Sequence, residues 1–159
     1  MRIAVTGHRD LRGRTAELTA TALRERIAAI AGRAPLVGIT CLADGADTMF
    51  ADAVLDAGGA IEVVIPAEEY RAGLPEAHHP DYDRLLERAA VTTALDFKES
   101  TSESHMSASE AMLETAHHLI AVWDGRPARG FGGTADVVAE ARRRGVPVTI
   151  IWPEGAERS

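Results

Sequence analysis

The sequence predicts a single α/β domain in which two layers of helices enclose a mainly parallel sheet of five to six strands. Its 159 residues, 46% of them hydrophobic, suit one domain with a hydrophobic core better than two. Short apolar runs alternate with longer stretches of helical periodicity, which is typical of βαβ units. The apolar runs also lack polar alternation, as expected for parallel strands that are covered on both faces.

Five apolar runs are expected to form the strands. They are short, and most are rich in β-branched residues. In chain order they cover residues 3–5, 36–41, 61–65, 119–123 and 146–152. Residues 91–97 are compatible with one further short strand.

Five other stretches have the apolar periodicity of helices. The first two end at glycines, Gly32 and Gly58, and the last ends with three arginines before Gly145. Glycine is the usual residue just after a helix, and cations suit the negative end of the helix dipole. The apolar positions of these helices span residues 18–30, 49–57, 85–90, 106–116 and 137–141.

These elements together predict one three-layer, Rossmann-like domain over residues 1–159. The least regular part is residues 66–104, where prolines and a serine-rich stretch interrupt the periodicity. A lid or a helix-bearing insertion is expected there.

Composition narrows the classes of partner. The formal net charge of −7 opposes attraction to a polyanion, so DNA is an unlikely partner. The N-terminus has no signal-peptide core or membrane span, and a lone cysteine, Cys41, cannot form an internal disulfide. We therefore expect a cytoplasmic protein without a membrane partner, with Cys41 as a small buried thiol.

The histidine pairs give no support for a metal site. His78 and His79 are adjacent, as are His117 and His118, so that the side chains of each pair diverge. No CxxC or HExxH spacing accompanies them. The sequence therefore predicts no metal and no bound cofactor.

Two glycine- and arginine-rich loops predict an anion site. They read TGHRDLRGR after the first strand and DGRPARGFGGT after the fourth. In an open parallel sheet, ligands bind beyond the carboxyl ends of the strands, where the strand order reverses. Glycines let backbone N–H groups approach an anion, and the start of the following helix adds partial positive charge. The predicted ligand-binding residues here are Thr6, Gly7, His8, Arg9, Arg14, Gly130, Gly132, Gly133 and Thr134.

Two alternatives remain open for these loops. The glycines are also compatible with a plain turn, and Thr134 can either cap the helix or bind the anion. The Walker pattern GxxxxGK[ST] is absent, and so is GxGxxG after the first strand. The residues themselves therefore predict a small phosphate-bearing anion and do not specify ATP or NAD.

A third loop follows the second strand and contains Asp44, Gly45 and Asp47. Its small residues allow a helix start to pack close to a ligand or to a neighbouring strand. Its carboxylates can cap that helix, or they can hold ribose hydroxyls. Both interpretations stay open.

Two segments resemble a known superfamily. "GITCLADGADTMFADAVLDAGGAIEVVIP" is similar to the segment of the DNA-processing protein A group that reads, in outline, SGLARGIDxxAHxxAL. "LIAVWDGRPARGFGGTADVVAEARRRGVPVTII" resembles the closing half of small nucleotide-binding proteins of the same superfamily, called SLOG after its DNA-processing and "lonely guy" branches. The resemblance covers nearly the whole chain. It implies a Rossmann-like fold that binds a nucleotide or nucleotide derivative between the first-strand loop and the GGT loop, often as a homo-oligomer.

The enzymatic branch consists of phosphoribohydrolases, which cleave the base from a nucleoside 5′-monophosphate. Their motif PGGxGTxxE has a glutamate where this chain has Val137, and N-glycoside cleavage needs a carboxylate near the sugar. The possible substitutes are Asp136, Glu140 and Glu110. The branch also uses an arginine on the helix before the fourth strand, and this helix has none. We therefore expect a binding module or sensor, with a phosphoribohydrolase as the alternative.

Overall fold

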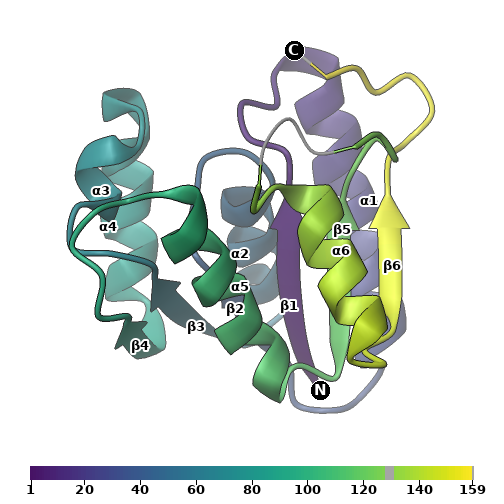
Figure 1. Ribbon diagram of the computed structural model, residues 1–159. Coiled ribbons are helices and arrows are strands. Elements are labelled where there is room, and N and C mark those ends of the chain that lie inside the picture. The colour runs from purple at the N-terminus through teal and green to yellow at the C-terminus, as the bar shows by residue number, and fades with distance from the viewer. Residues whose placement is uncertain (128–130, 159) are drawn as a thin grey trace.

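The computed structural model describes residues 1–127 and 131–158. It shows a six-stranded parallel sheet in the order β4-β3-β2-β1-β5-β6 (Figure 1). The predicted α/β class and the parallel sheet are confirmed. The strands are β1 (Arg2–Gly7), β2 (Val37–Thr40), β3 (Ala60–Ile65), β4 (Ala89–Ala94), β5 (His118–Val122) and β6 (Val148–Ile151).

Helices cover both faces of the sheet. Figure 1 shows α5 and α6 in front of the strands and α1 and α2 behind them, and α4 packs against α2. These layers give the three-layer arrangement that the sequence predicts. The helices are α1 (Gly13–Ala31), α2 (Ala46–Asp56), α3 (Tyr70–Gly73), the 3₁₀ helix η1 (Glu76–His78), α4 (His79–Glu87), α5 (Ser102–Thr115) and α6 (Thr134–Arg143).

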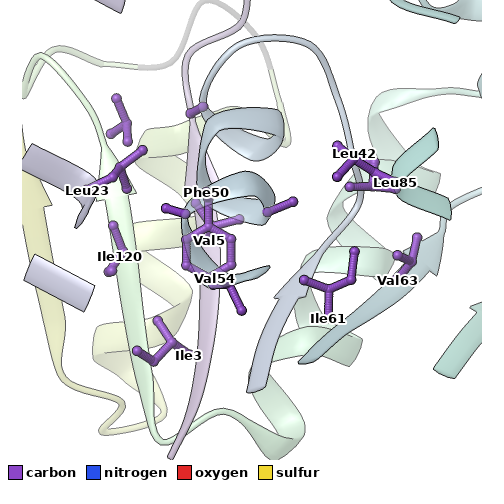
Figure 2. Close-up of a cluster of buried hydrophobic side chains, with 14 of the residues drawn as sticks. Ile3, Val5, Leu23, Leu42, Phe50, Val54, Ile61, Val63, Leu85 and Ile120 are labelled. Atoms are coloured by element: carbon purple, nitrogen blue, oxygen red, sulfur yellow. The ribbon is translucent and has the colours of Figure 1, made fainter. Parts of the chain in front are cut away.

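The sheet separates two apolar clusters. Ile3 and Val5 of β1 pack with Phe50 of α2 in one cluster, which Figure 2 shows. Ala4, which lies between them in the strand, packs with Met112 of α5 in the other cluster. Successive side chains of a strand point to opposite faces, so β1 is covered on both faces and sits at the centre of the fold.

One predicted helix is wrong at its end. The helix expected over 85–90 stops at Glu87, and Ala89 already pairs with Ile61 of the neighbouring strand as the first residue of β4. Backbone pairing at the sheet edge decides the conformation here, and it overrides the helix preference of alanine. The possible extra strand at 91–97 overlaps β4.

The irregular segment 66–104 contains α3, η1, α4 and β4. Its central part is therefore attached to the fold, through the pairing of β4 with β3 and the packing of α4 on α2. Movement of this segment as a lid stays a prediction. None of the helices in the described residues has the length and apolar character needed to cross a membrane.

Candidate ligand-binding site

A cavity of about 300 Å³ lies at the carboxyl edge of the sheet, between the ends of β1, β2 and β3 and the helices α5 and α6. This volume is at the lower end of the range for small-molecule sites. Gly7 of β1 is paired with Val122 of β5, so the two glycine-rich loops start from neighbouring strands. Seven of the predicted residues line the cavity: Thr6, Gly7, Arg9, Asp47, Gly132, Gly133 and Thr134.

Two glycines let the start of α2 lie against the end of β1. A Cβ atom at Gly7 would be 2.5 Å from the Cβ of Ala46, and one at Gly45 would be 2.6 Å from the carbonyl oxygen of His8. Gly45 also has a φ of +86°, which strongly favours glycine. The two chain segments are joined by a hydrogen bond from the backbone N–H of Ala46 to His8 O, at 3.2 Å. Gly45 therefore packs against the first loop and does not line the cavity.

The second glycine loop is held by its own helix. The backbone N–H of Gly132 donates to Asp136 Oδ2 at 2.9 Å, and Gly132 has a φ of +84°. Gly133 is the N-cap residue, so Thr134 begins α6 and does not cap it. Within the described part of the chain, Thr134 Oγ1 has no hydrogen-bond partner. Gly130 lies outside the described residues.

Arg9 brings a positive charge to the cavity wall. Its Nε donates to Asp44 Oδ1 at 2.8 Å, and its side chain is 47% exposed. The other oxygen of Asp44 accepts from the backbone N–H of Asp10 at 3.2 Å. Asp44 therefore orients Arg9, which lines the cavity, and is not itself part of the cavity wall.

Asp47 is a buried acid in the same wall. Its Oδ2 accepts a hydrogen bond from the backbone N–H of Ala43 at 3.1 Å. Burial raises the pKa of Asp47 to about 7, against the opposing effects of the Ala43 hydrogen bond and the charge of Arg9. Near neutral pH, Asp47 can therefore be either a hydrogen-bond donor or an anion.

Three other titratable groups in the wall are kept neutral by burial. Burial raises the pKa of the Tyr70 hydroxyl and that of the Cys41 thiol well above their usual ranges. It also lowers the pKa of His105, which lies against Tyr70 with ring centroids 5.6 Å apart. Apart from Arg9 and Asp47, the described side chains of the wall are therefore largely uncharged at neutral pH.

Two further predicted residues, besides Asp44 and Gly45, lie away from this cavity. His8 is 5% exposed, and its Nε2 lies 3.1 Å from the backbone N of Asp124 and 3.3 Å from Oδ1 of the same residue. Its ring also meets Trp152 edge-on, so it packs against the neighbouring strands. Arg14, in the first turn of α1, borders a separate hollow with Gly155.

A second hollow of about 380 Å³ shares Gly7, Arg9, Gly133 and Thr134 with the cavity. It is also lined by Arg158, whose Nη1 lies 3.9 Å from Asp124 Oδ2. Two arginines therefore flank the start of α6, and each faces a carboxylate, Arg9 that of Asp44 and Arg158 that of Asp124. His8 and Asp10 line the same hollow.

The three candidate catalytic carboxylates lie outside the cavity. Asp136 holds Gly132, and Glu110 faces Arg144 with 3.7 Å between Oε2 and Nη2. Hydrogen bonds from Arg143 and Arg144 lower the pKa of Glu140 to about 2. In the described part of the cavity wall, the carboxyl group is that of Asp47. The described residues contain no group of three or more His, Cys, Asp or Glu side chains placed to hold a metal ion.

The cavity also contains residues that the sequence did not predict to bind ligand, among them Tyr70, Ser109, Met112 and Phe131. One signal was available: His105, Ser109 and Met112 have the spacing of one helical face. The sequence did not show that this face meets the cavity, because that depends on how α5 packs on the sheet.

Comparison with protein-family models gives no match, and comparison with curated proteins gives none either. Several solved structures have a similar fold. DNA processing protein A from Streptococcus pneumoniae is 18% identical with a TM-score of 0.67, over 98% of this chain and 52% of that one. The Helicobacter pylori protein of the same name is 17% identical with a TM-score of 0.68, over 100% and 68%. The molybdenum cofactor binding protein of Rippkaea orientalis is 17% identical with a TM-score of 0.58, over 94% and 74%.

This chain spans about half the length of the Streptococcus pneumoniae protein. At 17–18% identity, sequence comparison alone would not reveal these three similarities. They are similarities of fold. The chain has the fold of DNA processing protein A, as its sequence resemblance predicts, and it has the fold of the molybdenum cofactor binding protein as well.

Proposed function

We propose that the cavity binds a nucleotide or a nucleotide-derived phosphate, and that the protein acts as a binding module or sensor for this ligand. The observation that carries the proposal is the composition of the cavity wall. It combines cationic groups, Arg9 and the start of α6, with largely uncharged side chains such as Tyr70 and Met112. A ligand with a phosphate group and a less polar remainder matches this combination.

We assign the phosphate group of the ligand to the cationic groups around the start of α6. The first turn of α6 presents backbone N–H groups and the positive end of its dipole, and the Thr134 hydroxyl lies beside it. Arg9 and Arg158 flank the same helix start from the adjoining hollow. This local positive charge contrasts with the net charge of −7 for the whole chain.

Proteins of the same fold bind different ligands. The Helicobacter pylori protein is described as binding single-stranded DNA, and the Rippkaea orientalis protein as binding the molybdenum cofactor. For this chain the net negative charge disfavours DNA, and a cavity of about 300 Å³ suits a small molecule. We therefore propose a small ligand, and include an oligonucleotide in the test.

The test is thermal unfolding with nucleoside 5′-monophosphates, cyclic nucleotides, ADP-ribose and a thymidine oligonucleotide. A binding ligand at a hundred times its Kd is expected to raise the Tm by roughly 5 °C or more. Arg9→Gln should weaken binding by about tenfold or more, because a charged hydrogen bond to phosphate is lost. Arg24→Gln is the matched control, since Arg24 forms an exposed ion pair with Asp56 on the far face of the sheet.

Two results would contradict the proposal: no small ligand raises the Tm, or Arg24→Gln weakens binding as much as Arg9→Gln. If the oligonucleotide is the one compound that raises the Tm, the ligand is single-stranded DNA and the proposal of a small ligand is wrong.

The alternative function is a phosphoribohydrolase acting on nucleoside 5′-monophosphates. One observation favours it: the carboxyl of Asp47 lies in the cavity wall, and its pKa of about 7 suits acid–base chemistry. The same incubations, analysed for free base by chromatography, separate the two functions. We expect no release; release that Asp47→Asn abolishes would establish the hydrolase.

We also propose that the chain forms a homo-oligomer, and we keep the cytoplasmic location as a prediction from the sequence. Five of the six residues of β4 are exposed, and Val91 among them is 49% exposed. Sedimentation equilibrium is expected to give a multiple of the monomer mass, with Val91→Glu shifting it toward the monomer. A monomer mass for the wild-type protein would contradict this.

A further inference from the structure

The cavity wall also contains two buried hydroxyl groups, those of Tyr70 and Ser109, without a hydrogen-bond partner in the described part of the chain. Tyr70 is 4% exposed and Ser109 is 8% exposed, and both line the cavity. Neither hydroxyl has a hydrogen-bond partner among the residues that the structure describes. Buried hydroxyls in native proteins are normally hydrogen-bonded, so these two need an explanation.

The two hydroxyls face the cavity. Thr19 Oγ1 is the one fully enclosed side-chain polar atom without a partner in the described part of the chain. The oxygens of Tyr70 and Ser109 therefore retain accessible surface, and the cavity is the space that these two buried side chains line. The raised pKa of Tyr70 keeps its hydroxyl protonated, so it can donate a hydrogen bond to a ligand.

An exposed aromatic ring lies at the rim of the same cavity. Phe131 lines the cavity although its side chain is 64% exposed, the largest exposure among the bulky apolar residues of the described chain. The backbone of the next residue is held in place: the N–H of Gly132 is bonded to Asp136, and a Cβ atom at Gly132 would lie 2.8 Å from the carbonyl oxygen of Ser102. The loop therefore rests on the first turn of α5, with Phe131 at the entrance.

We propose that Phe131 and Tyr70 recognise a planar, nitrogen-containing aromatic ring such as a nucleobase. Phe131 stacks on the face of the ring, and the Tyr70 hydroxyl donates to a ring nitrogen or carbonyl oxygen. Stacking would cover an apolar side chain that is otherwise left in water. This inference rests on the proposed function and adds a base-recognising end to the phosphate end at Arg9 and Thr134.

The test compares nucleotides with ribose 5-phosphate, which has the same sugar and phosphate but no base. Binding of AMP, GMP, CMP, UMP and ribose 5-phosphate is measured by calorimetry. Phe131→Ala is expected to weaken the best nucleotide about tenfold, the usual contribution of one stacked base. Tyr70→Phe is expected to weaken it about fivefold through the lost hydrogen bond. Neither substitution should change the binding of ribose 5-phosphate.

Two further variants complete the experiment. Ile150→Ala is the matched control, because Ile150 is an exposed apolar residue of β6, 44% exposed, that does not line the cavity. It should leave every affinity unchanged. Phe131→Trp keeps a stacking ring and gives a fluorescence signal at the rim, which a nucleotide should alter and ribose 5-phosphate should not.

The inference is overturned if Phe131→Ala weakens nucleotide and ribose 5-phosphate equally, or weakens neither. It is also overturned if the wild-type protein binds both with the same affinity, and in that case the proposed function still stands. If none of these ligands binds and the wider nucleotide panel gives no thermal shift, the proposed function itself fails. Melting curves of Tyr70→Phe show whether a loss of binding reflects lost stability.

Discussion

Alanine at position 45 is expected to lower the free energy of unfolding by roughly 3 kcal/mol or more, from backbone strain and overpacking together. Gly45 has a φ of +86°, and a Cβ atom there would lie 2.6 Å from His8 O and 2.9 Å from Arg9 Cα. Both neighbours are backbone atoms, so no side chain can rotate away. Chemical denaturation of the wild-type protein and Gly45→Ala, followed by circular dichroism, measures the difference.

Gly58→Ala separates the two causes. Gly58 follows the same helix α2 and has a φ of +82°, but a Cβ atom there meets nothing within 4 Å. This variant should therefore show only the backbone cost, about 1 to 2 kcal/mol. If both variants lose the same stability, the close approach of α2 to the first loop has no energetic importance.

Stability is also expected to fall as the pH rises from about 4 to about 7, because of Asp47. Burial raises its pKa from 3.8 to about 7 in the folded protein. Below pH 3.8 both states hold the proton and the group has no effect. Between the two values the unfolded chain loses the proton while the folded protein keeps it, so the free energy of unfolding decreases. The full loss is on the order of 4 kcal/mol, and it is complete above about pH 7.

Asp47→Asn tests this directly, since asparagine resembles the protonated acid and does not titrate. Relative to the wild-type protein, its Tm should increase steadily between pH 4.5 and pH 8. Asp52→Asn is the control, because Asp52 lies on the same helix but is paired with Arg84 at the surface. A wild-type profile that runs parallel to that of Asp47→Asn across this range would show that the buried acid does not titrate there.

Most of the fold could be predicted from the sequence, because five strands are apolar runs and four of them are largely buried, while β6 at the sheet edge is partly exposed. The strand β4 is the instructive exception. Its sequence AAVTTA is exposed at all but the first position, so neither apolar periodicity nor burial marks it. Its β-branched residues Val91, Thr92 and Thr93 are the local signal, and the end of α4 at Glu87 is set by pairing with β3.

The site could be predicted only where its residues lie in loops that directly follow strands. Gly7 ends β1 and Arg9 follows it, Gly133 lies in the loop between β5 and α6, and the parallel topology brings these two loops to one cavity. His8 lies between Gly7 and Arg9, yet its ring packs on Trp152 and Asp124, because alternate residues at a strand end point in different directions. The placement of Tyr70 depends on how the segment after β3 packs under α5, and local sequence does not determine this.

The hydrogen bond between Gly132 and Asp136 has a consequence for the kinetics of recognition. The chain's own carboxylate fixes this turn before any anion arrives, so an incoming molecule does not have to order it. The entropic cost of association is reduced accordingly. Capture should then be fast, and differences among competing molecules should appear mainly in how long each one stays bound.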